Sequence, residues 1–590
     1  MASRLTRRRF VVLGSGSTIA AGSVLLAACG GSGSNAPATT AATTGTGSST
    51  TTSTTSSGTS ATPATSGGTA ASPAAQATRT VTKPPSGGEL KIALSNEPPN
   101  LDPHQASALL TAEIISSVFD TLLFREEDNT LVPGLATKWD VSSDGTTVTF
   151  TLQSGVKFHD GAAFNAAAMK QSLDRMIDPA TKSGLAASLL GPYKSSEAVD
   201  DATLKVTLGT AYAPLMGNLA SVFTAPVSPA AIKQYGLDVA THPVGTGPFM
   251  FKEWVQKDHM TYDRFPDYNW APAFFGFNGP APLDRLTFQF VAEDATRIAT
   301  LQNGQADMVE SFPPQFVSQF QDKTKYAIDV KMNPGVPFSF MVNTQKAPTN
   351  DLAVRQAIEY GIDKDSISKT LLFGINPPAR GPLAPVSFAY WKGAEQLYGF
   401  DAAKASSVLE QAGWAAGSGG IRAKGGQSLS VEFWTLSDIV SFQNIAQAFQ
   451  AQMKTVGIDV KIVSLARAAW GAGVESGKHN LTVQIFGLAD PSVLSINFHS
   501  KNIPQNGGQG FNWSFYKNPQ LDSLLDQGDV TLDSTKRIQI YQDAQQIIMN
   551  DAIIVPVYVL EQVWARTVAV QGLTYGIGGL PFFYTASLKK

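Results

Sequence analysis

The residue types that most often carry chemistry in proteins are sparse in this sequence and do not group. It contains six histidines, at His104, His159, His242, His259, His479 and His499. None belongs to a His-Glu-x-x-His pattern, which would place two imidazoles on one face of a helix as metal ligands. We therefore expect core or solvated histidines and no metal site, unless distant parts of the chain bring several histidines together.

Two further stretches lack the details that phosphate binding or catalysis would need. Gly473–Lys478 is shorter than a phosphate-binding loop, and His479 stands where such a loop has Ser or Thr. The run Glu126–Asp128 is typical of a solvated turn. A hydrolase would need a nucleophile and a base from distant segments, and nothing in the sequence points to such a pair. We therefore expect no catalytic residue, no cofactor and no enzyme activity.

Composition narrows the class of protein further. The 590 residues are enough for several domains, and a hydrophobic content of 43% supports sizeable cores. The net charge of −3 provides no basic footprint, so nucleic-acid binding is not expected. The single cysteine, Cys29, excludes a disulfide framework and a multi-cysteine metal centre.

Residues 1–28 have the pattern of an export signal. Arg4 and Arg7–Arg9 form a basic start, and an uncharged, moderately apolar stretch continues to Ala28. The Thr6–Phe10 segment is similar to a twin-arginine export motif, and general secretion is the other route. Leu26-Ala27-Ala28-Cys29 resembles a bacterial lipobox, which implies that a lipid on Cys29 anchors an extracytoplasmic protein to the cell membrane.

A long linker follows the cysteine. Residues 29–88 consist almost wholly of Ser, Thr, Gly, Ala and Pro. Such a composition buries too little apolar surface to offset the entropy of the chain, so we expect a disordered tether. A flexible chain of this length spans roughly 40 Å. It would hold a folded body away from a membrane surface.

The body begins with elements that the residue pattern marks clearly. Apolar residues alternate in Glu89–Ser95, which predicts a strand. In Leu131–Gly161, Asp144-Gly145 predicts a hairpin turn because glycine accepts the positive φ of a tight turn. Val148–Leu152 predicts a half-buried strand, and Asn165 predicts the cap of a helix. Strands and helices continue to alternate along the chain, which indicates an α/β fold.

Several segments, in the same order, resemble the extracytoplasmic solute-binding proteins of ABC importers, family 5, the oligopeptide-, dipeptide- and nickel-binding type. These segments are Leu101–Pro103, Leu131–Gly161, His242–Phe249 with Asp263–Trp270, Asn343–Asp363 and Phe515–Leu524. The resemblance covers nearly all of residues 89–590. It implies a bilobal α/β fold like that of periplasmic binding proteins of class II, with an extra subdomain.

The resemblance also implies how the body is divided. Lobe I is expected to comprise residues 89–130, 240–342 and 557–590, and the extra subdomain attached to it residues 131–239. Lobe II is expected at residues 343–556. The chain would therefore cross to lobe II near Asn343 and return near Pro556.

The function implied by the resemblance is solute capture by closure of the two lobes, followed by delivery to an ABC permease. A peptide is the default ligand, and sugars, opines and nickel chelates are the other candidates. We expect a monomer whose partners are the ligand and the permease subunits. A secreted hydrolase or a sensory binding module of similar architecture is the alternative.

A ligand pocket needs aromatic walls and a few placed polar groups. The candidates are Trp391, Trp434, Phe486, Asp490 and Arg355. By resemblance, Gly487–Pro491 corresponds to the region where peptide-binding members hold the α-ammonium group of the ligand with an aromatic residue and an aspartate. Leu488 stands where Trp is common. Core packing of the two tryptophans and a structural salt bridge of Arg355 are the competing interpretations.

If Cys29 carries the anchor, Cys29→Ala should move the protein from the membrane fraction to the soluble fraction. The variant lacks the thiol that would be lipidated, while the sequence of the body is unchanged. Fractionation and immunoblotting of cells measure the shift, and Ser32→Ala in the tether is the matched control. An unchanged membrane-bound fraction would contradict the anchor.

Overall fold

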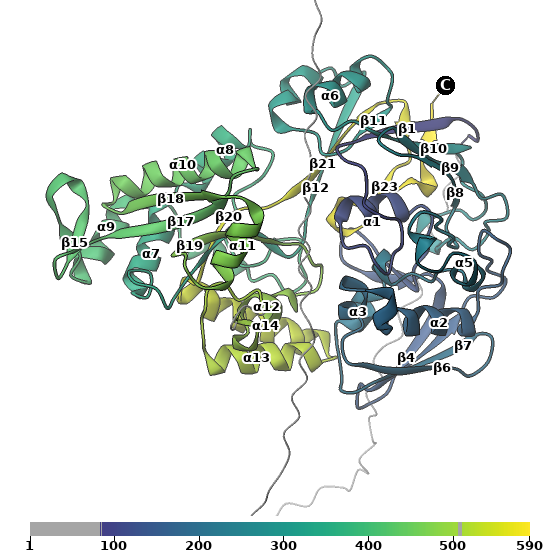
Figure 1. The fold of residues 1–590 in the computed structure, drawn as a ribbon, viewed down its shortest axis with the longest axis horizontal. Helices are drawn as coiled ribbons and strands as arrows, with labels where there is room; N and C mark the ends of the chain where they lie inside the picture. Colours follow the sequence, from purple (N-terminus) through teal and green to yellow (C-terminus); the bar gives the residue numbers. More distant parts are fainter. Residues whose placement is uncertain (1–82, 84, 505–509, 590) are drawn as a thin grey trace, which may run out of the picture. The chain divides into compact units, whose positions relative to one another are not determined.

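The structure of the protein, a computed structural model, describes residues 83, 85–504 and 510–589. The expected export signal, Cys29 and nearly all of the expected tether lie outside the described residues. Within the described ranges, no helix is both long enough and apolar enough to cross a membrane. Two larger sheets and their helices, labelled in Figure 1, form a bilobal α/β fold.

The first large sheet has seven strands in the order β12-β21-β11-β1-β10-β9-β8. Their bounds are β1 Glu89–Leu94, β8 Phe249–Val255, β9 His259–Arg264, β10 Arg285–Phe290, β11 Met308–Val309, β12 Tyr326–Met332 and β21 Glu561–Thr567. Strand β1 is parallel to β10 and β11, and the other pairs are antiparallel. The predicted first strand is confirmed, with Leu90, Ile92 and Leu94 fully buried. We call this sheet with its packed elements lobe I.

A second, four-stranded antiparallel sheet, β4-β5-β7-β6, belongs to the same part of the protein. Its strands are β4 Ala136–Val141, β5 Thr147–Leu152, β6 Tyr193–Ala198 and β7 Thr203–Leu208. Gly145 has a φ of +68° in the turn between β4 and β5, as the hairpin signal predicted. Helix α2 (Ala166–Ile177) begins after Asn165, whose side chain accepts a hydrogen bond from Ala168 N at 3.0 Å. The sheet shares one hydrophobic core with lobe I.

The other large sheet has five strands in the order β18-β17-β19-β13-β20. Their bounds are β13 Val336–Val342, β17 Ser430–Leu436, β18 Asp459–Leu465, β19 Leu481–Phe486 and β20 Ile554–Tyr558. Strand β17 is parallel to β18 and β19, whereas β13 is antiparallel to β19 and β20. Phe340, Phe433 and Phe449 pack with ring centroids 4.5–5.5 Å apart in the core. We call this sheet with its packed elements lobe II.

Helices and short strands complete both lobes. In lobe I they include α1 Leu109–Ile115, α3 Leu185–Leu189, α4 Leu215–Asn218, α5 Pro229–Tyr235, α6 Asp294–Gln302, β2 Leu123–Arg125 and β3 Leu131–Pro133. In lobe II they include α7 Leu352–Gly361, α8 Lys364–Leu371, α9 Ala402–Gln411, α10 Val440–Thr455, α11 Arg467–Glu475, α12 Val493–Phe498, α13 Pro519–Val530 and α14 Ser534–Asn550. Figure 1 shows α10 beside β18 and β17, and α13 beside α14.

The chain passes between the two large sheets at positions that differ from the expected ones. It leaves β12 at Met332 and enters β13 at Val336, before the expected crossing near Asn343. It returns between β20 and β21, after the expected crossing near Pro556. Pro556 lies inside β20, which is an edge strand, and the pairing with β13 shifts register beside it. An edge position and a bulge both tolerate the missing N–H of proline, so this residue does not end the strand.

The glycine-rich segment His242–Phe249 is part of the scaffold of lobe I. Gly247 N donates to Val118 O at 2.8 Å, and Phe249 N donates to Ser117 O at 3.0 Å. A Cβ added at Gly247 would lie 2.6 Å from Val118 C and 2.7 Å from Ser117 O. The glycine is therefore needed because two main-chain segments approach each other closely.

We expect Gly247→Ala to lower the free energy of unfolding by about 1–3 kcal/mol, because the new methyl group meets main-chain atoms that have no rotamer to change. Urea unfolding followed by circular dichroism measures the loss. Gly471→Ala in α11 is the matched control, since no atom lies within 4 Å of its added Cβ. The control should be neutral or slightly more stable, and equal stability of both variants would refute the close-contact explanation.

Candidate functional site

The topology brings the carboxyl ends of parallel strands in both lobes to the two passages of the chain. In lobe II, β19 ends at Phe486, which is paired with Val336 at the start of β13. In lobe I, β1 and β11 end at Leu94 and Val309, on the side where β21 begins. Ligands of open α/β sheets bind outside the carboxyl ends of the strands. We therefore take these two edges as the candidate site.

The edge of lobe II carries four connected aromatic rings, which we call the aromatic row. Phe486 and Phe511 have ring centroids 5.2 Å apart, Phe511 and Trp513 6.0 Å, and Trp513 and Trp470 5.3 Å. Trp470 Nε1 donates to Thr482 Oγ1 at 3.0 Å, which fixes the buried end of the row. Phe511 is 41% exposed at the other end. Such a row can form the wall of a pocket for a small solute.

The edge of lobe I carries acidic and amide groups. Glu310 follows β11, and its Oε2 accepts a hydrogen bond from Ser95 N at 3.0 Å, directly after β1. Glu113 of α1 accepts a hydrogen bond from Gln562 Nε2 of β21 at 2.7 Å. Burial, and secondly the charge of Glu310, raise the pKa of Glu113 well above its ordinary value. The two edges therefore differ in chemistry, one aromatic and one acidic.

Phe486 is the expected pocket residue that the structure places in the aromatic row. Trp434 is only 9% exposed and belongs to the core of lobe II, and a Cβ at Gly473 would lie 2.0 Å from its ring. Trp391 is half-buried on the same core, and its main-chain N donates to Gln545 Oε1 at 3.1 Å. The two tryptophans thus pack against the core of lobe II. Core packing is the competing interpretation that the sequence offered for them.

Arg355 has a structural role rather than an exposed position for a ligand. Its Nε donates to Asp551 O at 2.8 Å, and its Nη1 donates to Thr349 O at 3.0 Å and Asn350 O at 3.2 Å. The residue is only 6% exposed. Its guanidinium group joins α7 to the segment after α14 by hydrogen bonds to main-chain oxygens. The competing interpretation of the sequence was a salt bridge, which is a different kind of contact.

Asp490 is held by Arg537 of α14 in a buried, bidentate ion pair, with Nη2 to Oδ1 at 2.6 Å and Nη1 to Oδ2 at 2.8 Å. Ser492 N also donates to Oδ1 at 2.9 Å. Burial alone would raise the pKa of Asp490, but the charge and hydrogen bonds of Arg537 outweigh it and lower the pKa below its ordinary value. The charge expected to attract a ligand ammonium group is already neutralised within the protein.

Two of the histidines lie in the protein interior. His104 and His479 are fully buried, with Nε2 2.9 Å from Ala225 O and 2.8 Å from Trp513 O respectively. Burial lowers the pKa of each to about 4. In the described part of the chain, no group of three or more His, Cys, Asp or Glu side chains could hold a metal ion.

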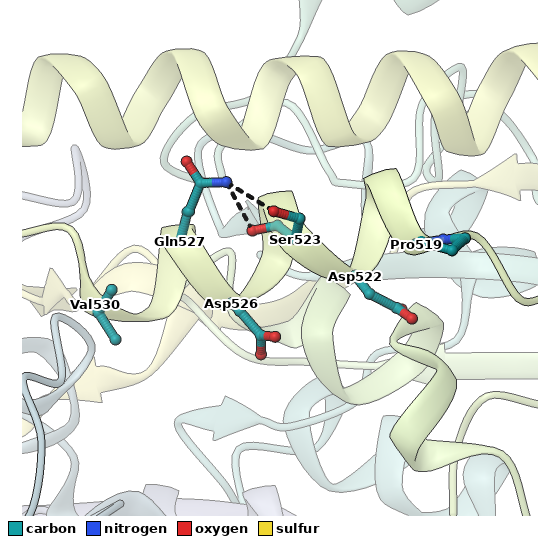
Figure 2. A pocket seen from close by; sticks show the side chains of 6 residues that line it. All are labelled: Pro519, Asp522, Ser523, Asp526, Gln527 and Val530. Carbon is teal, nitrogen blue, oxygen red and sulfur yellow. Dashed lines mark hydrogen bonds between the residues drawn. The ribbon is translucent and has the colours of Figure 1, made fainter. Parts of the chain in front are cut away.

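A surface pocket of about 570 Å³ is lined by residues of α13. Figure 2 shows its lining residues Pro519, Asp522, Ser523, Asp526, Gln527 and Val530. The acids have partners in the protein, since Asp526 Oδ1 lies 3.1 Å from His499 Nε2 and Asp522 Oδ1 accepts from Ser500 N at 2.9 Å. Because it has no aromatic wall and its acids are paired, we do not assign the ligand to it.

Sequence reasoning missed most of the residues at the two edges. Phe511 and Trp513 carry a weak signal, because they alternate directly after a polar, glycine-rich stretch. Glu113 carries a stronger one, as the single charged residue in the apolar helix Leu109–Ile115. A carboxylate on a buried helix needs a partner or a function, so this residue could have been singled out.

The comparisons with known proteins agree with the two-lobed fold. The family model described as "Bacterial extracellular solute-binding proteins, family 5 Middle" matches residues 130–504. A protein named glutathione-binding protein GsiB, from Pectobacterium atrosepticum, is 33% identical over 471 residues, covering 78% of this chain and 86% of that protein. The structure of HbpA2 from Haemophilus parasuis has a TM-score of 0.74 at 24% identity, covering 85% of this chain and 100% of that one. The structure of DppA from Helicobacter pylori with the peptide STSA has a TM-score of 0.69 at 26% identity, covering 86% and 99%.

We expect Asp490→Asn to lower the free energy of unfolding at pH 7 by about 3–5 kcal/mol, because the charge of Arg537 stays buried without a partner. A carboxylate with a lowered folded-state pKa stabilises the fold above its unfolded-state pKa of about 4 and loses that effect as the pH falls further. The difference in free energy of unfolding between the wild type and Asp490→Asn should therefore become smaller below about pH 4. Urea unfolding from pH 7 to pH 3 measures it.

Asp140→Asn is the matched control, because the Asp140 side chain is 70% exposed. It should leave the stability at pH 7 unchanged. An Asp490→Asn variant of full stability that has lost ligand binding would overturn the structural assignment and restore Asp490 as a ligand anchor.

Proposed function

Because the chain belongs to family 5 of the bacterial extracellular solute-binding proteins, we propose that it captures a peptide-type solute between its two lobes. Proteins of this family deliver their ligands to ABC transporters, and this chain does the same. The finer part of the proposal is the ligand class, a short peptide or a peptide-like compound such as glutathione. In the proposed role, the protein binds and releases the ligand without changing it chemically.

The proposal rests on two features at the ends of parallel strands, the aromatic row at the edge of lobe II and the acidic side chains at the edge of lobe I. A peptide offers apolar side chains for such a row and an amino group for the acids. Two relatives support the ligand class: GsiB is named for glutathione, and the DppA structure contains the peptide STSA. A polar sugar or a metal chelate would interact less directly with the acidic side chains of lobe I than the amino group of a peptide would.

The proposal includes the setting in which the protein works. An extracytoplasmic location follows the family, and the lipobox-like Leu26–Cys29 supports an anchor through Cys29. The proposed division is lobe I, a subdomain in residues 131–239 attached to it, and lobe II, with the passages at Met332–Val336 and Tyr558–Glu561. The partners are the ligand and the permease subunits, and the protein acts as a monomer.

Thermal shift and calorimetry of the full chain test the ligand class, with glutathione, the peptide Ser-Thr-Ser-Ala, a nickel–histidine chelate and maltose as probes. A ligand at 100 times its Kd should add about 2.7 kcal/mol to the stability of the protein. We expect a response to at least one of the two peptide probes. A response only to the chelate or the sugar, or to none of the four, would contradict the peptide proposal.

Phe511→Ala should weaken binding of the responding peptide about tenfold, because an aromatic contact contributes roughly 1 kcal/mol beyond its buried area. Phe400→Ala is the matched control, since Phe400 of lobe II is 49% exposed and outside the aromatic row. Calorimetric titration measures both affinities. If the two variants bind equally well, the aromatic row is not the pocket wall.

A further inference from the structure

Outside the two passages of the chain, the part of lobe I that carries β4–β7 contacts lobe II near the end of α13. Ala213 N, in the segment between β7 and α4, donates to Asp529 O in the last turn of α13 at 2.8 Å. A Cβ added at Gly145 would lie 3.0 Å from Leu532 Cδ1, so Leu532 packs against the turn between β4 and β5. We call these two contacts, Ala213 with Asp529 and Gly145 with Leu532, the interlobe contact.

The hydrogen bond from Ala213 completes the end of a helix in the other lobe. The last carbonyl oxygens of a helix have no partner within it. In α13, Gly528 O accepts from Arg537 Nε of lobe II at 2.8 Å, whereas Asp529 O accepts from Ala213 N of lobe I. If the lobes separate, water has to replace this partner of the Asp529 carbonyl, and the 40% exposed Leu532 loses apolar contact. The interlobe contact therefore favours the arrangement in which the lobes are together.

The half of the interlobe contact that belongs to lobe II is held in place by α14. The Tyr541 hydroxyl donates to Asp529 Oδ1 at 2.8 Å. Arg537, which binds Gly528 O, also forms the bidentate ion pair with Asp490 after β19. The same guanidinium group thus fixes the end of α13 and the loop that follows the first ring of the aromatic row, Phe486.

The half that belongs to lobe I is equally well supported. Tyr212, next to Ala213, accepts a hydrogen bond on its hydroxyl from Asn218 Nδ2 at 3.4 Å. Its ring lies so close to Gly191 that an added Cβ there would meet it. Pro214 restricts the main chain on the other side of Ala213. Because both halves are ordered by their own lobes, little conformational entropy is lost when they meet.

We propose that the interlobe contact stabilises the closed arrangement of the lobes, and so sets the affinity for the ligand without touching it. This inference rests on the proposed function, the capture of a solute between the two lobes. The residues of the interlobe contact belong neither to the aromatic row nor to the acidic edge of lobe I. They act as positioning residues for the pocket wall and not as part of it.

The proposal has a quantitative signature. When a ligand binds the closed form only, its apparent Kd equals the intrinsic Kd divided by the closed fraction of the protein. A substitution that lowers the closed fraction therefore weakens every ligand by the same factor. A substitution of a residue that touches the ligand weakens different ligands by different factors, because it removes a different contact from each.

The test compares the full-length wild-type chain with Leu532→Ser, using glutathione and Ser-Thr-Ser-Ala as probes. We expect the affinity for each probe that binds to fall by about threefold to tenfold, since a half-exposed leucine contributes only part of its full burial energy. Where both bind, the factor should be equal. Hydrogen exchange of the Ala213 amide, followed by mass spectrometry, should be slow in the wild type saturated with probe and faster in Leu532→Ser.

Leu352→Ser is the matched control, because Leu352 of lobe II is 39% exposed and outside the interlobe contact. It should keep wild-type affinity and exchange, and melting temperatures establish that both variants are folded. Three results would overturn the proposal while leaving the proposed function intact: unchanged affinity and exchange in Leu532→Ser, different factors for the two probes, or an equal loss in Leu352→Ser.

If neither probe binds the wild type, the proposed function fails, and the exchange of the Ala213 amide in the chain alone decides the inference. Slow exchange that Leu532→Ser accelerates would support the interlobe contact by itself. Exchange at the rate of a free amide would refute it as well.

Discussion

The protein depends on one topological constraint, the double passage of the chain between two sheets. Each passage joins an edge strand of one sheet to the strand next to the edge of the other, β12 to β13 and β20 to β21, so the sheet of lobe I is completed only after the chain has returned from lobe II. The passages also lie where parallel strands of both sheets end. The position of the candidate site follows from this arrangement, because the ends of parallel strands are where an α/β sheet presents loops, side chains and free main-chain groups together.

Within this arrangement, charge compensation separates structural residues from candidate ligand residues. The ion pair of Asp490 and Arg537 joins the loop after β19 to α14, and the guanidinium group of Arg355 joins main-chain oxygens from two other segments. Both groups are complete without a ligand. Glu113 Oε2, by contrast, is buried without a hydrogen-bond partner, and the aromatic row ends in an exposed ring. We expect a solute-binding site where polar or aromatic groups of the protein have no partner within the protein.

Local features of the fold could be predicted from sequence because they depend on neighbours in the chain. Gly145 in its turn and Asn165 at its helix were predicted for that reason, and the family resemblance is confirmed. The site was harder to predict. The role of Asp490 depends on Arg537, which lies 47 residues away, and that of Trp434 depends on the lack of a side chain at Gly473. Phe486 was the one expected residue in the aromatic row, whose other rings come from separate segments.

The buried imidazoles of His104 and His479 have a consequence for how the protein tolerates mild acid. Each is neutral in the folded chain, with a pKa of about 4, while an unfolded histidine titrates near 6.5. Between these values the unfolded chain takes up protons that the folded chain cannot accept, so the folding equilibrium shifts toward the unfolded chain as the pH falls. The two imidazoles therefore make the folded protein less stable at about pH 5 than at neutral pH.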